Sequence, residues 1–283
     1  MKSVTVKGPQ KSVTFANDKP FGLICGPCAI ESRDMIMQSA EHIAKIADKL
    51  GIEVVFKSSF DKANRSSLKG DRGVGAEEGL RILEEVRQNF GVPIITDIHE
   101  TAHVDAVAEV ADILQIPAFL CRQTDLLLKA ASTGKALNVK KGQFLAPADM
   151  ANIVAKVEST NNPNLMLCER GTTFGYGNLV SDMRSLRIMA ETEYPVVFDV
   201  THSVQMPGGN GTSSGGQRQF AEPLARAAVA VGVGGLFIEA HPDPSVAISD
   251  AANQIPLSEL EGLLRNLKTL DDISKETAYR KIA

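Results

Sequence analysis

Short apolar runs alternate with longer amphipathic segments along most of the chain. An apolar run bounded by polar residues indicates a strand that is buried on both faces. We expect such strands at 23–25, 53–56, 94–96, 113–116, 137–139, 165–168, 196–200 and 236–238. The amphipathic segments repeat apolar positions with helical spacing, which is typical of helices packed on one side. We expect helices at 33–50, 77–90, 102–110, 125–132, 148–158, 179–189, 220–231 and 257–278.

Eight strand–helix units in succession predict an α/β protein with a (β/α)8 TIM barrel. A doubly wound open sheet is the alternative, and it is disfavoured because no G-x-G-x-x-G motif follows the first strand. Before the barrel, 3–7 and 12–16 alternate apolar and polar residues around Gly8-Pro9, which indicates a β-hairpin. We therefore expect one domain over 1–283, with 1–19 as an N-terminal hairpin extension.

The composition changes this picture little but excludes some functions. Of 283 residues, 43% are hydrophobic and 23% are charged, as in globular proteins with a buried core. The net charge of −4 argues against general nucleic-acid binding, which requires a basic face. The most apolar stretch, 227–240, contains three glycines and is too short to span a bilayer, so we expect no membrane association. No apolar segment follows Met1, and the four cysteines fit a reducing compartment, so we expect a cytoplasmic protein.

Candidate chemistry lies at the strand ends, because the carboxyl ends of barrel strands meet at one rim. Four cations lie at or just after such ends: Lys57, Lys62, Lys140 and Arg170. Their mutual repulsion favours bound phosphate and carboxylate groups. Two alternatives stay open. Each cation could pair with a neighbouring carboxylate such as Asp97 or Glu239, or Lys140 could form a Schiff base.

One strand runs directly into the most cationic of these segments, 56–67. Lys57, Lys62 and Arg65 lie within nine residues there, beside Ser59 and Asn64. No helical pattern follows that would place these side chains on a solvated face. The segment is therefore interpreted as an anion-binding loop on a rigid scaffold, with a plain solvated loop as the alternative.

A second set of residues has the donor atoms of a metal site. Cys28, His202, Glu239 and Asp250 lie at or beyond the ends of the first and the last two strands, which become neighbours when a barrel closes. A thiolate, an imidazole and two carboxylates suit one divalent ion: zinc, iron, manganese or cobalt. Spacing alone supports this weakly, since Cys28 could be a buried thiol. The Cys25-Gly26-Pro27-Cys28 segment does not fit a thioredoxin motif, because Cys25 lies within a predicted strand and no helix begins there. It does not fit a zinc ribbon either, because no second cysteine pair is present.

The segment 208–216 is rich in glycine and small polar residues, which cannot pack a core. We interpret it as a lid over the rim, with a plain surface loop as the alternative.

At several of these places the sequence resembles the 3-deoxy-D-manno-octulosonate 8-phosphate synthases. The matching segments are Gly26-Pro27-Cys28-Ala29-Ile30-Glu31-Ser32, Phe60-Asp61-Lys62-Ala63-Asn64-Arg65-Ser66-Ser67, Gln115-Ile116-Pro117-Ala118-Phe119-Leu120, Asn138-Val139-Lys140-Lys141, Phe198-Asp199-Val200-Thr201-His202-Ser203 and Glu239-Ala240-His241-Pro242-Asp243-Pro244. The resemblance spans nearly the whole chain. It implies a (β/α)8 barrel, a homotetramer and an aldol-type transferase. That enzyme condenses phosphoenolpyruvate with D-arabinose 5-phosphate and water, and releases inorganic phosphate in lipopolysaccharide precursor synthesis.

The resemblance also implies roles for the residues that match. The phosphoenolpyruvate carboxylate region would be held by Lys57, Ser59, Lys62 and Gln115, and its phosphate by Lys140 and Arg170. The sugar would contact Asn64, and the sugar phosphate of a neighbouring subunit would bind Arg65 and Ser66. Asp97 completes the expected substrate-binding set. Similarity to the metal-dependent branch, at Cys28 and at Ser249-Asp250-Ala251, makes Cys28, His202, Glu239 and Asp250 the metal ligands, and the expected catalytic residues are Lys62, His202, Asp250 and Cys28.

Three other functions stay open at this point. A 3-deoxy-D-arabino-heptulosonate 7-phosphate synthase would use erythrose 4-phosphate, but its loop usually reads Lys-Pro-Arg where this chain has Lys62-Ala63-Asn64-Arg65. A Schiff-base aldolase would use Lys140. A phosphate-binding or metal-storage barrel would carry out no reaction.

Overall fold

The computed structural model of the chain describes residues 1–65, 68, 70–209, 211 and 214–277. Its main sheet contains eight parallel strands: β3 (Gly22–Gly26), β4 (Val54–Lys57), β5 (Ile94–Asp97), β6 (Ile113–Ile116), β7 (Ala136–Lys140), β8 (Leu165–Glu169), β11 (Val196–Asp199) and β14 (Gly235–His241). Each strand pairs with the next in the chain, and β14 pairs with both β11 and β3, which closes the sheet. The predicted (β/α)8 barrel is confirmed.

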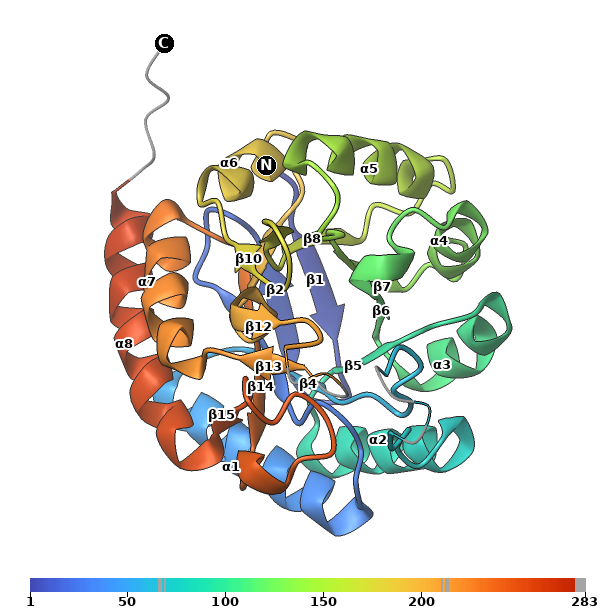
Figure 1. Cartoon of the computed structure of the whole chain (residues 1–283). Coiled ribbons are helices and arrows are strands. Elements are labelled where there is room, and N and C mark those ends of the chain that lie inside the picture. Colours follow the sequence, from blue (N-terminus) through green and yellow to red (C-terminus); the bar gives the residue numbers. More distant parts are fainter. Residues whose placement is uncertain (66–67, 69, 210, 212–213, 278–283) are drawn as a thin grey trace.

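In the described part of the chain, eight α-helices surround this barrel as a ring (Figure 1). They are α1 (Arg33–Leu50), α2 (Ala76–Phe90), α3 (Val104–Val110), α4 (Thr124–Ala131), α5 (Met150–Glu158), α6 (Arg184–Ala190), α7 (Ala221–Val231) and α8 (Leu257–Glu276). The limits of α1 match the prediction because local signals define both ends. The Ser32 side chain accepts a hydrogen bond from the Met35 amide, and Gly51 ends the helix in the left-handed conformation with φ 63°.

The remaining elements are 3-10 helices and short strands that do not belong to the barrel. The 3-10 helices are η1 (Thr101–His103), η2 (Ala118–Leu120), η3 (Pro147–Asp149), η4 (His202–Val204), η5 (Arg218–Phe220) and η6 (Pro244–Val246). The additional strands are β1 (Val4–Lys7), β2 (Ser12–Phe15), β9 (Thr172–Thr173), β10 (Leu179–Val180), β12 (Gln205–Met206), β13 (Gly215–Gly216) and β15 (Ile255–Pro256).

The prediction of a helix over 179–189 is wrong at its start. Leu179 and Val180 form β10, which pairs with β9, and α6 begins only at Arg184. An Asp182 side-chain oxygen accepts the Arg184 amide at 3.0 Å, as expected of a residue that precedes a helix. Two apolar strand residues happened to extend the helical spacing. The last residue predicted for the final helix, 278, lies outside the described residues.

The predicted N-terminal hairpin is confirmed, and it closes one end of the barrel. β1 and β2 pair in antiparallel register and lie across the centre of the ring in Figure 1. Four hairpin side chains join the barrel interior as one hydrophobic cluster: Val4, Val6, Val13 and Phe15. Phe15 packs against Gly22 and Gly235 at strand starts, so the hairpin plugs the amino-terminal end of the barrel. The hairpin and the barrel interior thus share one hydrophobic cluster, and one domain over 1–283 stays a prediction.

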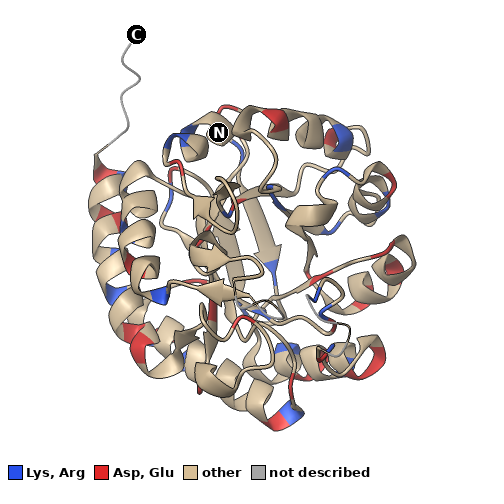
Figure 2. Cartoon of the chain, in the orientation of Figure 1, with Lys and Arg blue, Asp and Glu red and all other residues tan. Residues whose placement is uncertain are grey.

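Charged residues of both signs are distributed over the molecule. Figure 2 shows Lys and Arg alternating with Asp and Glu around the outer helices, and both also occur near the centre of the ring. Among the described residues, no helix combines the length and the apolar character that crossing a membrane requires.

Glycine at position 26 is a steric requirement of the sheet. A Cβ atom added to Gly26 would lie 1.9 Å from the backbone oxygen of Lys57 on β4. We expect Gly26→Ala to lower the free energy of unfolding by about 1–3 kcal/mol, because the strand ends must move apart. Gly262→Ala is the matched control, since a Cβ there contacts nothing within 4 Å; it should raise stability by about 0.5–1 kcal/mol. Urea denaturation of both variants measures this, and equal stability of Gly26→Ala and wild type would contradict the steric argument.

Candidate active site

A cavity of about 420 Å³ opens at the carboxyl ends of the strands. It is lined by twelve of the predicted site residues: Lys57, Ser59, Lys62, Asn64, Arg65, Asp97, Gln115, Lys140, Arg170, His202, Glu239 and Asp250. Cys28 is fully buried and contacts Asp250 from beside the cavity. Ser66, predicted to bind the sugar phosphate, lies outside the described residues. Residues from seven strand ends therefore meet at one place.

Two of the four cations are paired with carboxylates. Lys57, only 2% exposed, forms an ion pair with Glu239 at 2.7 Å and donates to the backbone oxygen of Cys28 at 3.1 Å. Lys140 pairs with Asp199 at 2.7 Å, and its Nζ lies 3.6 Å from the centre of the Phe237 ring. The expectation that repulsion among all four cations requires bound anions is therefore wrong for these two. Burial in the barrel demands that a charge be paired within the protein.

The other two cations are bonded to neutral groups. Lys62 donates to the Ser59 hydroxyl at 3.1 Å, and Arg170 donates through Nη2 to the Gln205 side-chain oxygen at 2.8 Å. Burial lowers the pKa of Lys62, but Cys28 and Glu239 outweigh it, so the pKa is raised and the ammonium persists. Arg170 Nη1 is buried without a hydrogen-bond partner in the part of the chain that the structure describes. An unpaired buried donor is costly, so an anionic oxygen fits here.

A hydrogen-bonded chain supports the Lys62 side of the cavity. Ser59, which accepts from Lys62, donates its hydroxyl proton to Asp97 Oδ1, and His99 Nε2 lies 2.8 Å from Asp97 Oδ2. Burial raises the pKa of Asp97, but His99 and Lys62 outweigh it and hold the pKa below its usual range. Asp97 therefore serves as an ionised acceptor that orients Ser59. The sequence prediction assigned no role to His99, although it follows Asp97 at the same strand end.

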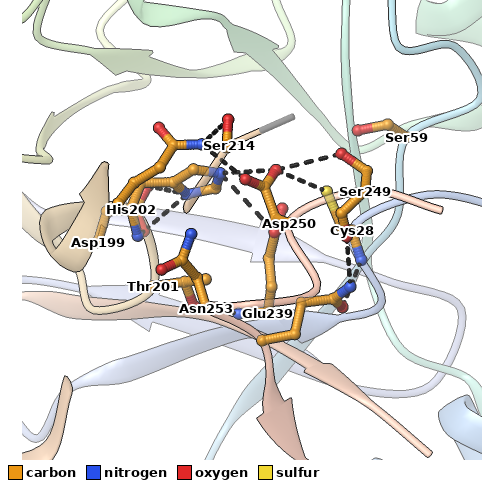
Figure 3. Close-up of polar contacts among 12 residues, drawn as sticks. Cys28, Ser59, Asp199, Thr201, His202, Ser214, Glu239, Ser249, Asp250 and Asn253 are labelled. Carbon is orange, nitrogen blue, oxygen red and sulfur yellow. Dashed lines mark hydrogen bonds and ion pairs between the residues drawn. The ribbon is translucent and has the colours of Figure 1, made fainter. Parts of the chain in front are cut away.

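The four predicted metal ligands lie together (Figure 3). Ligand atoms of Cys28, Glu239 and Asp250 lie within 4.8 Å of one another. His202 Nε2 is 3.7 Å from Glu239 Oε2 and 3.9 Å from Asp250 Oδ2. Its other ring nitrogen, Nδ1, lies 2.8 Å from Asp199 Oδ2 and is thereby oriented, which leaves Nε2 facing the cluster.

Two features make this cluster suited to a divalent cation: the types of ligand atom that it contains, and a hydrogen-bond acceptor without a partner in the described part of the chain. Glu239 Oε2 is buried and has no hydrogen-bond partner among the described residues. Burial, and then the charge of Glu239, raise the pKa of the Cys28 thiol. A cation bound here would accept Oε2 as a ligand and displace the thiol proton. The cluster is thus compatible with a metal, and its mixed sulfur, nitrogen and oxygen donors favour a transition metal over magnesium or calcium.

Comparison with known proteins agrees with this arrangement. The profile described as the DAHP synthetase I family matches residues 4–276. The chain belongs to this family. A protein of Syntrophotalea carbinolica is 59% identical over 93% of this chain and 95% of its own length, and one of Brucella anthropi is 57% identical over 93% and 95%. One of Caulobacter vibrioides is 55% identical over 96% and 95%. All three are named 2-dehydro-3-deoxyphosphooctonate aldolase, so the resemblance stated above is confirmed.

Several residues of this family member were missed by the sequence prediction because they act through other residues. Asp199 holds His202 and Lys140, and Gln205 lies between Arg170 and Asp250. Gln254 accepts the Cys28 amide at 3.0 Å and donates to the Ser249 backbone oxygen at 2.9 Å. That contact ties the loop after β14 to the loop after β3. Asp199 could have been found, since it ends a predicted strand three residues before His202; the two glutamines carry no local signal.

The bond from Asp199 to His202 predicts how the metal site responds to mutation. Asp199→Asn should weaken the affinity for Co²⁺ about 10–100-fold, because the amide no longer fixes the imidazole with a charge. Isothermal titration of the metal-free protein measures this. Asp112→Asn is the matched control: Asp112 accepts from Arg87 Nε and the Ile94 amide, both at 3.0 Å, away from the cluster. It should lower stability and leave Co²⁺ affinity unchanged. Equal Co²⁺ affinity of Asp199→Asn and wild type would show that Asp199 does not orient the ligand.

Proposed function

We propose that this chain condenses phosphoenolpyruvate with D-arabinose 5-phosphate and water. The products are 3-deoxy-D-manno-octulosonate 8-phosphate and inorganic phosphate, used in lipopolysaccharide precursor synthesis. The observation that carries the proposal is one cavity in which the unfilled donor of Arg170 and the cation Lys62 lie beside the cluster that suits a metal. The relatives' name supports the substrate pair. An octonate has eight carbons, and phosphoenolpyruvate supplies three of them, which leaves a five-carbon sugar.

The donor substrate has two anionic ends, and the cavity offers two sets of groups for them. Lys57, Ser59, Lys62 and Gln115 would hold the carboxylate region, and Lys140 and Arg170 the phosphate. Support comes from Arg170 Nη1, a buried donor without a hydrogen-bond partner among the described residues. Because Lys57 and Lys140 are already paired with Glu239 and Asp199, they would orient the donor more than neutralise it.

The sugar phosphate would lie further out, where Asn64 contacts the sugar, and Arg65 and Ser66 bind the sugar phosphate of a neighbouring subunit. This assignment requires self-association, for which we propose a homotetramer. Large aromatic side chains near the rim support an interface there, since more than half of each is exposed: Phe119, Phe144, Phe174 and Tyr176.

The proposed reaction forms one carbon–carbon bond and one carbon–oxygen bond from water, and it breaks the carbon–oxygen bond to phosphate. The enol carbon of phosphoenolpyruvate attacks the sugar aldehyde, whose oxygen takes up a proton. Water adds to the cationic carbon left behind, and the hemiketal phosphate then loses phosphate by cleavage of the bond from that carbon to oxygen. Lys62, held as an ammonium, can donate a hydrogen bond to the developing alkoxide.

Cys28, His202, Glu239 and Asp250 would hold one divalent ion: zinc, iron, manganese or cobalt. When bound, such an ion supplies Lewis-acid stabilisation of a substrate oxygen or an acidified water. Asp199 keeps His202 oriented, and the carboxylates of Glu239 and Asp250 lie close enough to Lys62 to raise its pKa. The proposed catalytic set is therefore Lys62, His202, Asp250 and Cys28.

Two other functions receive less support. A Schiff base requires Lys140 Nζ to be free to attack a carbonyl, whereas this atom is held in an ion pair with Asp199 and in contact with the Phe237 ring. A barrel that only binds phosphate or stores metal does not account for two different sites in a single cavity.

Substrate choice is the decisive test. Wild-type protein mixed with phosphoenolpyruvate should release inorganic phosphate at least about 10-fold faster with D-arabinose 5-phosphate than with erythrose 4-phosphate, since a missing hydroxymethylene group costs of the order of 1–3 kcal/mol in a fitted site. A colorimetric phosphate assay measures both rates under identical conditions. Faster release with erythrose 4-phosphate would establish the heptulosonate reaction instead.

Metal removal tests the role of the cluster. Protein stripped with a chelator should lose most phosphate release and regain it with zinc, iron, manganese or cobalt, and Cys28→Ala should neither bind Co²⁺ tightly nor recover. Cys121→Ala is the matched control, because Cys121 is a buried thiol of the outer core. That variant should respond to stripping and add-back as wild type does. Full activity of metal-free wild type would overturn the metal assignment.

A further inference from the structure

The side chain of Gln205 joins the two halves of the site. It belongs to β12, directly after η4, which carries His202. Its side-chain oxygen accepts from Arg170 Nη2 at 2.8 Å, and its Nε2 donates to Asp250 Oδ1 at 2.6 Å. Nε2 also lies 3.3 Å from the Ser214 hydroxyl oxygen. One amide thus connects Arg170, which is proposed to bind the phosphate, with Asp250, one of the four proposed metal ligands.

The chemistry of its two neighbours dictates how this amide is oriented. A guanidinium can only donate, and an ionised carboxylate can only accept. Glutamine satisfies both at once, with its oxygen toward Arg170 and its nitrogen toward Asp250. A glutamate would place a like charge against Asp250, and a lysine would place one against Arg170. The contact requires an amide of this length.

Among the four proposed metal ligands, the bridge determines which oxygen of Asp250 lies toward Cys28 and His202. Oδ1 accepts from Gln205, while Oδ2 lies 3.3 Å from Cys28 Sγ and 3.9 Å from His202 Nε2. Asp250 stands on a loop and has a positive φ of 50°. The Gln205 amide holds Oδ1, and Ser249 Oγ, at 3.2 Å, and Cys28 Sγ hold Oδ2 of a carboxylate whose backbone belongs to no strand.

At Arg170, the same bridge determines which guanidinium nitrogen is left without a protein partner in the described structure. Nη2 is used by Gln205, and Nη1 is the buried donor that the described residues leave unfilled. If the amide shifts, Arg170 loses its side-chain contact with Gln205 and with it the constraint on the guanidinium that carries Nη1. Displacement of Asp250 moves the amide, and displacement of Arg170 does so too.

We infer that Gln205 is a positioning residue that couples cation binding at Asp250 to anion binding at Arg170. The inference rests on the proposed function for the identity of the two ligands. By linkage, the factor by which phosphoenolpyruvate tightens cation binding must equal the factor by which the cation tightens phosphoenolpyruvate binding. Opposite charges attract through space as well, so part of the coupling persists without the amide. The part that passes through Gln205 disappears when the amide is removed.

Titration of the metal-free, full-length protein with Co²⁺, with and without phosphoenolpyruvate and without sugar, measures the coupling factor. In wild type we expect phosphoenolpyruvate to tighten Co²⁺ binding by about 5-fold or more. Gln205→Met has similar length but no polar group; it should weaken Co²⁺ binding about 10-fold and reduce the coupling factor to less than half. Gln205→Glu conserves volume and should reduce the coupling likewise, because it repels Asp250. Gln219→Met, at an exposed glutamine of η5, is the matched control and should retain the wild-type factor.

A Gln205→Met protein with the wild-type coupling factor would overturn the inference. So would a wild type in which phosphoenolpyruvate leaves Co²⁺ affinity unchanged. Phosphate release by wild type with both substrates separates these results from the proposed function. Turnover without coupling through Gln205 refutes the inference alone, whereas a lack of turnover refutes the proposed function.

Discussion

The central constraint in this structure is the pairing of charges that the barrel buries. Lys57 and Glu239 come from β4 and β14, Lys140 and Asp199 from β7 and β11, and each pair meets at 2.7 Å with little exposure. Removing one member of a buried pair leaves the other uncompensated, at a cost of about 3–5 kcal/mol. The carboxyl ends of these strands must therefore keep their register relative to one another. That register also determines the position of every group around the cavity.

Most of the described buried charges around the cavity have a partner within the protein, so the few buried atoms without one indicate where ligands are expected. Arg170 Nη1 and Glu239 Oε2 are buried atoms without hydrogen-bond partners in the described structure, one a donor and the other an acceptor. Both residues line the cavity, and Glu239 Oε2 lies 3.7 Å from His202 Nε2 in the cluster suited to a cation. Gln205 and Asp199 are fully engaged with protein partners and support these two positions. The site thus contains two kinds of residue. Some fix the positions of their neighbours, and others have a hydrogen-bonding atom without a protein partner among the described residues.

Sequence reasoning predicted the barrel, the hairpin and the convergence of the strand-end residues, because those follow from periodicity and from the direction of parallel strands. The sequence offered Glu239 as one possible partner of the strand-end cations, but it could not assign a carboxylate to a particular cation. Lys57 with Glu239 joins residues 182 positions apart, and no local pattern encodes such a contact. Strand β10 was interpreted as the start of a helix because its two apolar residues, Leu179 and Val180, fell into helical spacing. Gln205 was missed since a glutamine after a strand gives no signal until Arg170 and Asp250 are seen on either side of it.

The hairpin at the amino-terminal end gives the barrel the form of a cup with a sealed base. Val4, Val6, Val13 and Phe15 fill that base with apolar side chains. Under the proposed function, both substrates, the water and both products would then share a single opening. A molecule bound near this opening would block the exit of one bound deeper. The molecule that binds deeper would therefore enter first and leave last.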